Sequence, residues 1–466
     1  MRRLFVAAVI LGSAGILSTA AFGQTAPVSG QAFAPFMGTY QLPTGDIILV
    51  SRMGVTDEVA RPYFLDWQTG RYGYLTAREA DRFTATASAK PDAVVQTDVI
   101  FSRNSAGAVD ALTITESGMP ARRASRVMRY TDREVVFKNG DVTLAATLRM
   151  PPGKGQFPAI VLVHGSGPGE RPQISLMNSF FAGLGLAVLT YDKRGCGGSG
   201  GDWKKVDLDV LAQDALAGVR WLKSQPGIDA KRVGVWGISQ GGWITPLAGS
   251  LDEGVGFVIN SSGPATSLRR QDSYNTANTL RYSGLNDDVI ALVVKGLNTL
   301  YDFGQGKASA DAVDEIMNQG RAYPEIKDLI LPPARQITPE AMYAKQKIGD
   351  PAWFFHLNPD NDALTPYKRL TCPVLVTYGR LDFTVPVEES EKLLAAIQAE
   401  SRRKNLTVAV IADSGHGYLR MQEAQPMNPI APMSISRAYF ASIETWLRAN
   451  RVIAPTRQPA GNRGVH

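Results

Sequence analysis

The segment VGVWGISQGGWI, at residues 233–244, gives the strongest indication of the fold. It begins with a short apolar run, and Gly237-Ile238-Ser239-Gln240-Gly241 follows at once, leading into residues that can open a helix. A strand that turns this sharply into a helix presents the side chain at its tip, and small residues two positions before and after the tip prevent clashes. The first N–H groups of the helix then point at developing negative charge. We therefore expect Ser239 to be a nucleophile at the edge of a sheet.

Apolar runs of similar length occur on both sides of this stretch and alternate with helical patterns. Runs that are apolar on both faces and separated by helices are typical of a mostly parallel sheet with helices on both faces, which makes the fold class α/β. The clearest helix is 206–222, whose apolar residues recur every three or four positions, and 436–447 is expected to be the closing helix. The expected parallel strands are 159–163, 187–191, 233–236, 257–259, 374–378 and 406–411.

The rest of the chain forms smaller segments around this α/β region. Before it, short alternating runs separated by polar turns predict a small antiparallel β domain, either a barrel or a sandwich. The α/β region opens with a hairpin turned at Asn139-Gly140. An insertion of about a hundred residues far exceeds an ordinary loop and should form a helical cap, with helices at 287–300 and 310–319. The expected division is a signal peptide at 1–23, the β domain at 24–130, the α/β domain at 131–264 and 371–451, the cap at 265–370 and a flexible tail at 452–466.

The N-terminus carries a targeting pattern. Met1-Arg2-Arg3 is positively charged, 4–17 is almost uniformly apolar, and the small residues that follow permit cleavage after Gly23 or Ala21. This order is typical of a secretory signal peptide, so we expect an exported protein, periplasmic or secreted. The alternative is an uncleaved anchor, since the apolar run is near the lower length limit of a membrane span. No later segment is apolar enough to span a membrane, so no stable insertion is expected after cleavage.

Composition excludes several classes of function. The chain has 466 residues, 44% of them hydrophobic, and a net charge of +6 without a basic block, which gives no reason to expect nucleic-acid binding. Its two cysteines, Cys196 and Cys372, are expected at opposite ends of the sheet and therefore as free thiols. No spacing of ligands predicts a metal site, and no cofactor is expected. The glycine-rich segment 191–200 lacks a Walker arrangement, so we interpret it as a tight turn in which Asp192 and Arg194 pin neighbouring loops.

A serine hydroxyl needs a base, and the chain has only four histidines, at positions 164, 356, 416 and 466. His416 lies in ADSGHG, just past the last expected strand, and is the predicted general base. His164 follows the first parallel strand in VHGSGPG and is expected to shape that loop. Asp382 follows the strand before the last one, in GRLDFTVP, and is the predicted acid that orients the histidine. Asp413 is the alternative acid, although a carboxylate this close to His416 more often caps a loop.

Acyl transfer also needs two hydrogen-bond donors for the oxyanion of the tetrahedral intermediate. The backbone N–H of Gln240, next after the nucleophile, is the first expected donor. The second is expected from the loop that begins at His164, with Ser166 as the leading candidate and Gly165 or Gly167 as alternatives. The glycines of this loop allow its backbone to approach a substrate closely.

These motifs together resemble a known family. Residues 131–450 are similar to bacterial α/β-hydrolases of the serine aminopeptidase and prolyl-oligopeptidase-like group, which includes exported esterases. The resemblance implies the α/β-hydrolase fold and a triad of Ser239, Asp382 and His416, in the chain order of that fold. The matching motifs are HGSGPG at 164–169, YDKRG at 191–195, WGISQGG at 236–242, GRLD at 379–382 and SGHG at 414–417.

The sequence therefore favours hydrolysis of carboxylic esters through an acyl-enzyme intermediate, on a small-molecule ester or peptide substrate. An aminopeptidase or dipeptidyl-peptidase-like activity and a thioesterase activity would use the same residues and stay open as alternatives. A non-catalytic binding protein with a hydrolase fold is a further alternative. The region before the α/β domain is too short to form the propeller of a prolyl oligopeptidase. The substrate and the oligomeric state remain open.

Overall fold

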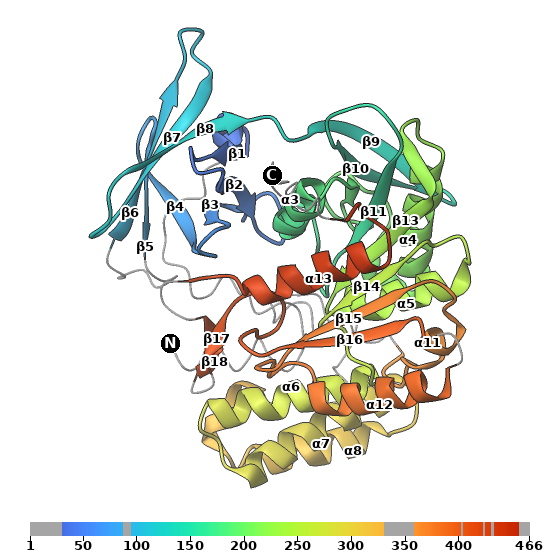
Figure 1. The fold of residues 1–466 in the computed structure, drawn as a ribbon. Coiled ribbons are helices and arrows are strands. Elements are labelled where there is room, and N and C mark those ends of the chain that lie inside the picture. Colours follow the sequence, from blue (N-terminus) through green and yellow to red (C-terminus); the bar gives the residue numbers. More distant parts are fainter. Residues whose placement is uncertain are drawn as a thin grey trace, which may run out of the picture.

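The computed structural model describes residues 30–86, 95–329, 358–401, 404–422, 425–429 and 433–455. The predicted signal peptide, most of the predicted tail, part of the predicted cap and two of the four histidines lie outside the described residues. Figure 1 shows a small β domain at the upper left, a large sheet with its helices, and a group of helices at the bottom. No helix within the described ranges is both long and apolar enough to cross a bilayer.

The N-terminal β domain is a closed barrel of antiparallel strands, which decides between the two architectures that the sequence left open. Closure removes the exposed edges of the sheet, since the first strand pairs with the last (Thr39 opposite Val127). Phe33 and Phe36, from short helices before the barrel, pack on Phe83 inside it. The elements are α2 (Gly30–Phe33), η2 (Ala34–Phe36), β1 (Gly38–Gln41), β2 (Ile47–Met53), β3 (Arg61–Asp66), β4 (Tyr72–Glu79), β5 (Arg82–Thr86), β6 (Val95–Arg103), β7 (Val109–Glu116) and β8 (Arg122–Val127).

The large sheet has the strand order β16-β15-β14-β13-β11-β12-β10-β9. β9 and β10 form an antiparallel hairpin in which Val142 pairs with Asn139, and β10 also pairs antiparallel with β12. From β12 to β16 the pairing is parallel. The predicted hairpin, the six predicted strands and the α/β-hydrolase fold are therefore confirmed. The strands are β9 (Thr131–Asn139), β10 (Val142–Met150), β11 (Phe157–Val163), β12 (Ala187–Tyr191), β13 (Ile228–Ile238), β14 (Val258–Ser261), β15 (Val374–Gly379) and β16 (Leu406–Ile411).

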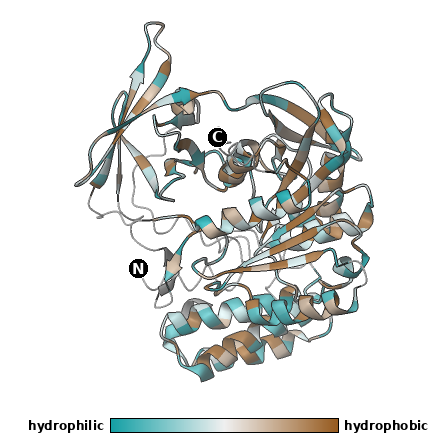
Figure 2. Ribbon diagram, viewed as in Figure 1, coloured by the Kyte–Doolittle hydropathy of each residue, from teal (hydrophilic) through white to brown (hydrophobic). Residues whose placement is uncertain are grey.

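Helices cover both faces of this sheet because its strands are apolar on both sides. In β11, Val161 packs in the cluster that contains α4, α5 and α12, whereas Ile160 and Leu162 pack in the cluster that contains α3 and α13. Figure 2 shows the strands of the large sheet mostly apolar, while the barrel strands alternate. The predicted helices at 206–222 and 436–447 correspond to two of these elements. The helices are α3 (Ser175–Gly183), α4 (Leu208–Lys223), α5 (Gln240–Leu251), α12 (Val387–Glu400) and α13 (Arg437–Ala449).

The insertion between β14 and β15 is helical in the part that the structure describes. Two of its helices were predicted from the sequence, and α6 was not, because its polar composition hides the apolar stripe. α6 is hydrogen-bonded to the loop that follows β15. Asn278 Nδ2 donates to the Phe383 carbonyl at 2.8 Å, and Gln271 Nε2 donates to the Thr384 carbonyl at 3.1 Å. The elements are α6 (Leu268–Tyr282), α7 (Asp287–Gly304), α8 (Ala310–Gly320), η5 (Pro324–Leu329) and α11 (Thr365–Arg369).

The barrel packs against the sheet face that carries α3 and α13. Leu49, Tyr63 and Leu65 of the barrel belong to the same buried apolar cluster as these two helices. Trp67 stands edge-on to Phe440 of α13, with 5.1 Å between ring centroids. The remaining short elements are η3 (Arg171–Ile174), η4 (Trp203–Lys205), β17 (Met421–Gln422) and β18 (Gln425–Pro429).

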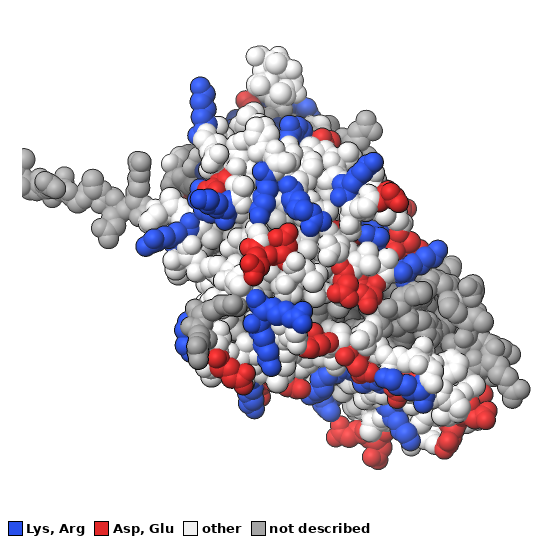
Figure 3. Space-filling view, turned by 90° about the vertical axis from the view of Figure 1, so that its right-hand side faces the viewer, with Lys and Arg blue, Asp and Glu red and all other residues white. Residues whose placement is uncertain are grey.

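One face of the molecule carries charges of both signs. On the face that Figure 3 shows, lysines and arginines intermingle with acidic residues and form no block of one sign.

One ion pair is buried and joins three elements. Arg194, in the turn after β12, donates from Nε and Nη2 to the two carboxylate oxygens of Asp214 on α4, at 2.7 and 2.6 Å. Asn139 of the hairpin donates to the same carboxylate at 2.7 Å. Both charged side chains are nearly inaccessible, 7% and 1% exposed. The prediction that Arg194 pins neighbouring segments is confirmed.

We predict that Asp214→Ala lowers the free energy of unfolding by about 3–5 kcal/mol, because the Arg194 guanidinium stays buried without its counter-charge. Urea unfolding followed by tryptophan fluorescence measures the change. The matched control is Asp229→Ala, which removes the partner of the more exposed Arg232 and should cost about 1 kcal/mol or less. Equal unfolding midpoints for Asp214→Ala and the native chain would contradict the prediction.

Candidate active site

Ser239 occupies the turn between β13 and α5 in a backbone conformation with φ +57° and ψ −118°. A non-glycine residue in this region is strained and persists only where its surroundings hold it. Its N–H donates to the carbonyl of Ser261 on the neighbouring strand at 2.9 Å. A Cβ at Gly237 would stand 2.4 Å from the carbonyl oxygen of Gly241. The backbones of these two glycines are in direct contact, which explains why small residues are required two positions before and after Ser239.

The loop after β11 passes directly beside this turn. A Cβ at Gly165 would stand 3.5 Å from the Ser239 Cβ, and one at Gly241 would stand 2.8 Å from the Val163 carbonyl oxygen. Because α5 begins at Gln240, the N–H of that residue has no partner within the helix. The backbone N–H of Ser166 donates to no backbone carbonyl in the described part of the chain. The two predicted oxyanion donors therefore lie on the segments that meet at Ser239.

His164 is a buried part of this loop's framework. Its ring is 1% exposed and lies between the side-chain oxygen of Gln173 (2.7 Å from Nδ1) and the Tyr191 carbonyl (2.6 Å from Nε2). Burial lowers the pKa of His164, more than its hydrogen bonds raise it. Gly169 covers the ring so closely that a Cβ there would come 2.7 Å from Cγ. These contacts fit the prediction that His164 shapes the loop.

His416 and Asp382 are paired. Asp382 Oδ2 lies 2.8 Å from His416 Nδ1, and the other carboxylate oxygen accepts the N–H groups of Thr384 and Val385 at 2.8 and 3.1 Å. The backbone thus fixes the carboxylate, and the carboxylate fixes the ring so that Nε2 is the nitrogen available for proton exchange. Burial lowers the pKa of His416, but the charge and hydrogen bond of Asp382 outweigh it, so that the pKa lies above its ordinary value.

The loop that carries His416 lies beside the turn at Ser239. The N–H of Gly417 donates to Ser262 Oγ at 3.1 Å, and a Cβ at Gly417 would stand 3.2 Å from Ile238 Cδ1. Ser261 and Ser262, which follow one another at the end of β14, therefore hold the serine turn and the histidine loop respectively. Sequence reasoning missed both serines, because their only signal is their position at the end of a buried strand.

Asp413, the alternative acid, has other partners. Its carboxylate accepts from Ser436 Oγ at 2.6 Å and from Arg420 Nε at 3.0 Å. Ser436 caps α13, so Asp413 ties the histidine loop to the start of that helix. The side chain that meets His416 is that of Asp382.

The barrel supports the histidine loop from behind. The Ile435 N–H donates to the Gly70 carbonyl in the β3–β4 turn at 2.8 Å, and Arg420 N–H donates to the Ser434 carbonyl at 2.9 Å. Tyr418, two residues after His416, donates its hydroxyl to Met53 Sδ of β2 at 3.6 Å. No sequence signal indicated that the β domain would reach this loop.

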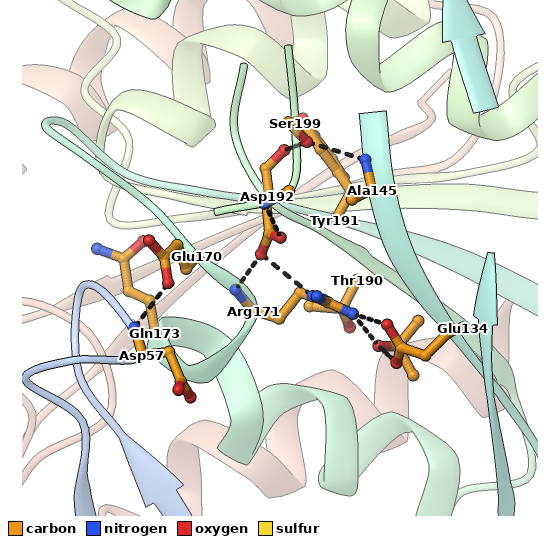
Figure 4. A network of polar contacts seen from close by, with 12 residues as sticks. Asp57, Glu134, Ala145, Glu170, Arg171, Gln173, Thr190, Tyr191, Asp192 and Ser199 are labelled. Atoms are coloured by element: carbon orange, nitrogen blue, oxygen red, sulfur yellow. Dashed lines mark hydrogen bonds and ion pairs between the residues drawn. The ribbon is translucent and has the colours of Figure 1, made fainter. Parts of the chain in front are cut away.

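The turn after β12 is held by Asp192, as Figure 4 shows. Its carboxylate accepts from the backbone N–H and the Nε of Arg171, and from the N–H of Gly198. Arg171 reaches on to Glu134 of β9. The prediction that this glycine-rich segment is a structural turn is confirmed.

Lys193, between Asp192 and Arg194, has contacts that the sequence analysis did not foresee. Its Nζ donates to the carbonyls of Gly165 and Gly167 at 2.8 and 3.0 Å, and to Gln240 Oε1 at 2.9 Å. The sequence placed both loops directly after predicted parallel strands, but only the pairing of β11 with β12 in the structure shows that the two loops lie at the same edge of the sheet.

Within the described ranges, no group of three or more histidine, cysteine, aspartate or glutamate side chains could hold a metal ion. Cys196 follows the carboxyl end of β12, and Cys372 precedes the amino end of β15. Both are free thiols, as predicted.

The chain is similar to a known protein family and to several known proteins. The model of the X-Pro dipeptidyl-peptidase (S15) family matches residues 139–418. The chain is 28% identical over 335 residues to the esterase EstD of Thermotoga maritima. The alignment covers 68% of this chain and 69% of EstD. It is also 30% identical over 154 residues to the quorum-quenching protein AidA of Acinetobacter baumannii. That alignment covers 33% of this chain and 50% of AidA. Among solved structures, the Pyrococcus furiosus esterase PF2001 matches with a TM-score of 0.43 and 17% identity, over 69% of this chain and 91% of that one.

We predict that Asp382→Asn moves the pKa of His416 from above its ordinary value to below it, because the carboxylate charge is lost while burial remains. Imidazole NMR signals followed against pH measure the shift, with His416→Gln used for assignment. The matched control is Asp413→Asn, whose side chain contacts Ser436 and Arg420 and should leave the pKa of His416 unchanged. A His416 that titrates at the same pH with and without Asp382 would refute the pairing.

Proposed function

Because the chain belongs to the X-Pro dipeptidyl-peptidase (S15) family and is a serine hydrolase, we propose that it cleaves carboxylic esters through an acyl-enzyme on Ser239. The observation that carries the proposal is the hydrogen bond between His416 and Asp382, on a loop packed beside the strained turn of Ser239. A base held by a carboxylate beside a partly buried serine is the arrangement that activates a serine hydroxyl.

The proposed chemistry follows from the positions of these groups. Ser239 Oγ attacks the ester carbonyl while His416 Nε2 takes its proton, and Asp382 stabilises the imidazolium that forms. The N–H groups of Gln240 and Ser166 bind the oxyanion. His416 then gives the proton to the leaving alcohol, and a water molecule releases the acid by the same steps in reverse order. The base must be neutral to begin, so this cycle requires a pH above the raised pKa of His416.

A dipeptidyl-peptidase-like activity is the second candidate, since the family model that matches the chain bears the name of an X-Pro dipeptidyl-peptidase. EstD, which aligns over most of the chain, is an esterase, and this favours the ester as the first candidate. A thioesterase would use the same acyl-enzyme. The serine, histidine and aspartate serve all three, so the walls of the substrate site decide among them.

Those walls are expected to come from the cap, proposed at 265–370, and from the barrel domain, proposed at 24–130. α6 donates to the carbonyls of Phe383 and Thr384, next to Asp382. In the barrel, the N–H of Asp57 in the β2–β3 loop donates to Glu170 Oε2, next to the end of the loop that follows β11. Both segments thus border the catalytic domain proposed at 131–264 and 371–451.

We predict that the protein hydrolyses p-nitrophenyl acetate with a higher kcat/KM than glycyl-prolyl-p-nitroanilide, and that a fluorophosphonate labels it once. Ser239→Ala should abolish the label and lower kcat/KM by about 10⁶-fold, because the other groups cannot replace the nucleophile. Spectrophotometric assays and mass spectrometry of the labelled protein measure these outcomes.

Ser250→Ala is the matched control, since this serine lies on the same helix but donates only to the Leu247 carbonyl. It should keep full activity and labelling. A preference for the X-Pro amide would select the peptidase. A folded native protein that takes no label would support the non-catalytic binding protein instead.

We also propose that the protein is exported, on the basis of the charged and apolar segment at 1–23. Expressed in a Gram-negative host, the mature chain should begin after Gly23 or Ala21, as measured by mass spectrometry. Ile10→Arg, in the middle of the apolar run, should block processing because the run no longer inserts into the export machinery. A full-length native chain in the membrane fraction would instead support an uncleaved anchor.

A further inference from the structure

Lys193 is a buried cation without a role in the reaction described above. The side chain is 3% exposed, yet its ammonium donates to three oxygens, those of Gly165, Gly167 and the Gln240 side chain. All three acceptors are uncharged. An ammonium has three N–H donors and no lone pair, so its donors match these acceptors one to one, whereas a neutral amine could donate only two.

The bond to Gly165 fixes the direction of an oxyanion donor. The carbonyl of Gly165 and the N–H of Ser166 belong to the same peptide unit, and in a trans peptide these two groups point in opposite directions. An ammonium that holds the carbonyl on one side therefore turns the Ser166 N–H to the other side. The bond to Gly167 anchors the loop only, because the next residue is Pro168, which has no N–H.

The bond to Gln240 reaches the second donor. Gln240 is the first residue of α5, and its backbone N–H is the other group proposed to bind the oxyanion. Its side-chain oxygen accepts from the same ammonium that holds the loop after β11. One cation thus connects the two segments, which are otherwise 74 residues apart in sequence, from Ser166 to Gln240.

We propose that Lys193 is a positioning residue that holds the N–H groups of Ser166 and Gln240 at the spacing an oxyanion requires. The role rests on the proposed function, because it presupposes that these two groups bind the oxyanion. The charge itself contributes in the same direction, since a fixed cation in a water-excluded region stabilises the negative charge that develops in the transition state. Loss of one oxyanion donor typically lowers the rate by about 10²–10³-fold, which is the effect expected if Lys193 no longer holds these N–H groups.

The surroundings of Lys193 hold it in place. The backbone N–H of Lys193 donates to the Gly169 carbonyl at 2.8 Å, and the ammonium lies 5.0 Å from the centroid of the Trp203 ring. Its charged and titratable neighbours are Cys196, Asp192 and Arg194 on its own turn, Asp214 on α4, and His164. Burial lowers the pKa of Lys193 to about 8, against the opposing effects of Cys196 and Asp214. The ammonium is therefore lost as the pH rises through this value, and one of its three hydrogen bonds is lost with it.

Three enzymes assayed on p-nitrophenyl acetate between pH 6 and 10 test the proposal: the native chain, Lys193→Met and Lys193→Arg. We expect Lys193→Met to lower kcat by about 10²–10³-fold while KM changes less than about threefold, because the oxyanion forms only in the transition state. The native kcat should fall as the pH rises above about 8. This alkaline decline should be absent from both variants, since methionine carries no proton and arginine keeps its own.

Lys205→Met is the matched control, a lysine of the same segment that is 75% exposed, and it should match the native enzyme in rate and in pH profile. Circular dichroism shows whether each variant is folded, and a Lys193→Met chain that does not fold leaves the native and Lys193→Arg profiles to decide. A native kcat without an alkaline decline, or a folded Lys193→Met enzyme within threefold of the native kcat, would overturn the proposal. Absence of fluorophosphonate labelling in the native chain would instead mean that the proposed function fails.

Discussion

The backbone of Ser239 adopts φ +57° in the turn between β13 and α5, a conformation that costs energy and has to be held from outside. On one side, the Ser261 carbonyl of β14 accepts a hydrogen bond from the Ser239 N–H. On the other side, Gly165 of the loop after β11 packs closely against Ser239. Because these partners belong to the buried centre of the sheet, the turn cannot relax without displacing the core. The other groups of the candidate site are arranged around this one fixed point.

The parallel sheet accounts for how those groups arrive there. In a parallel sheet, the carboxyl ends of all strands lie at one edge, and the loops that follow them meet. Lys193 follows β12, Asp382 follows β15 and His416 follows β16. The last two loops touch so closely that a Cβ at Gly379 would stand 2.2 Å from the Gly415 carbonyl oxygen. Residues more than two hundred positions apart in sequence thus share one edge of the sheet.

The barrel and the cap contribute no group to the proposed chemistry, but both are bonded to loops that do. The β3–β4 turn of the barrel pairs with the segment that backs the histidine loop, through Gly70 and Ile435. The cap helix α6 bonds to the carbonyls that follow Asp382. A shift of either domain would therefore move a loop that carries a member of the proposed triad, which couples the position of these domains to the geometry of that triad.

The amino-acid sequence was enough to predict the α/β fold, the six parallel strands and the candidates Ser239, Asp382 and His416, because strand periodicity, sharp-turn glycines and residue order can be recognised along the chain. It left the β domain open between barrel and sandwich, and it gave Lys193, Ser261 and Ser262 no role. Those assignments depend on which carbonyls and hydroxyls meet across strands distant in sequence. They follow from the packing of the folded chain, because a lysine between an aspartate and an arginine is expected to be exposed from its sequence context, and only the structure shows that it is buried.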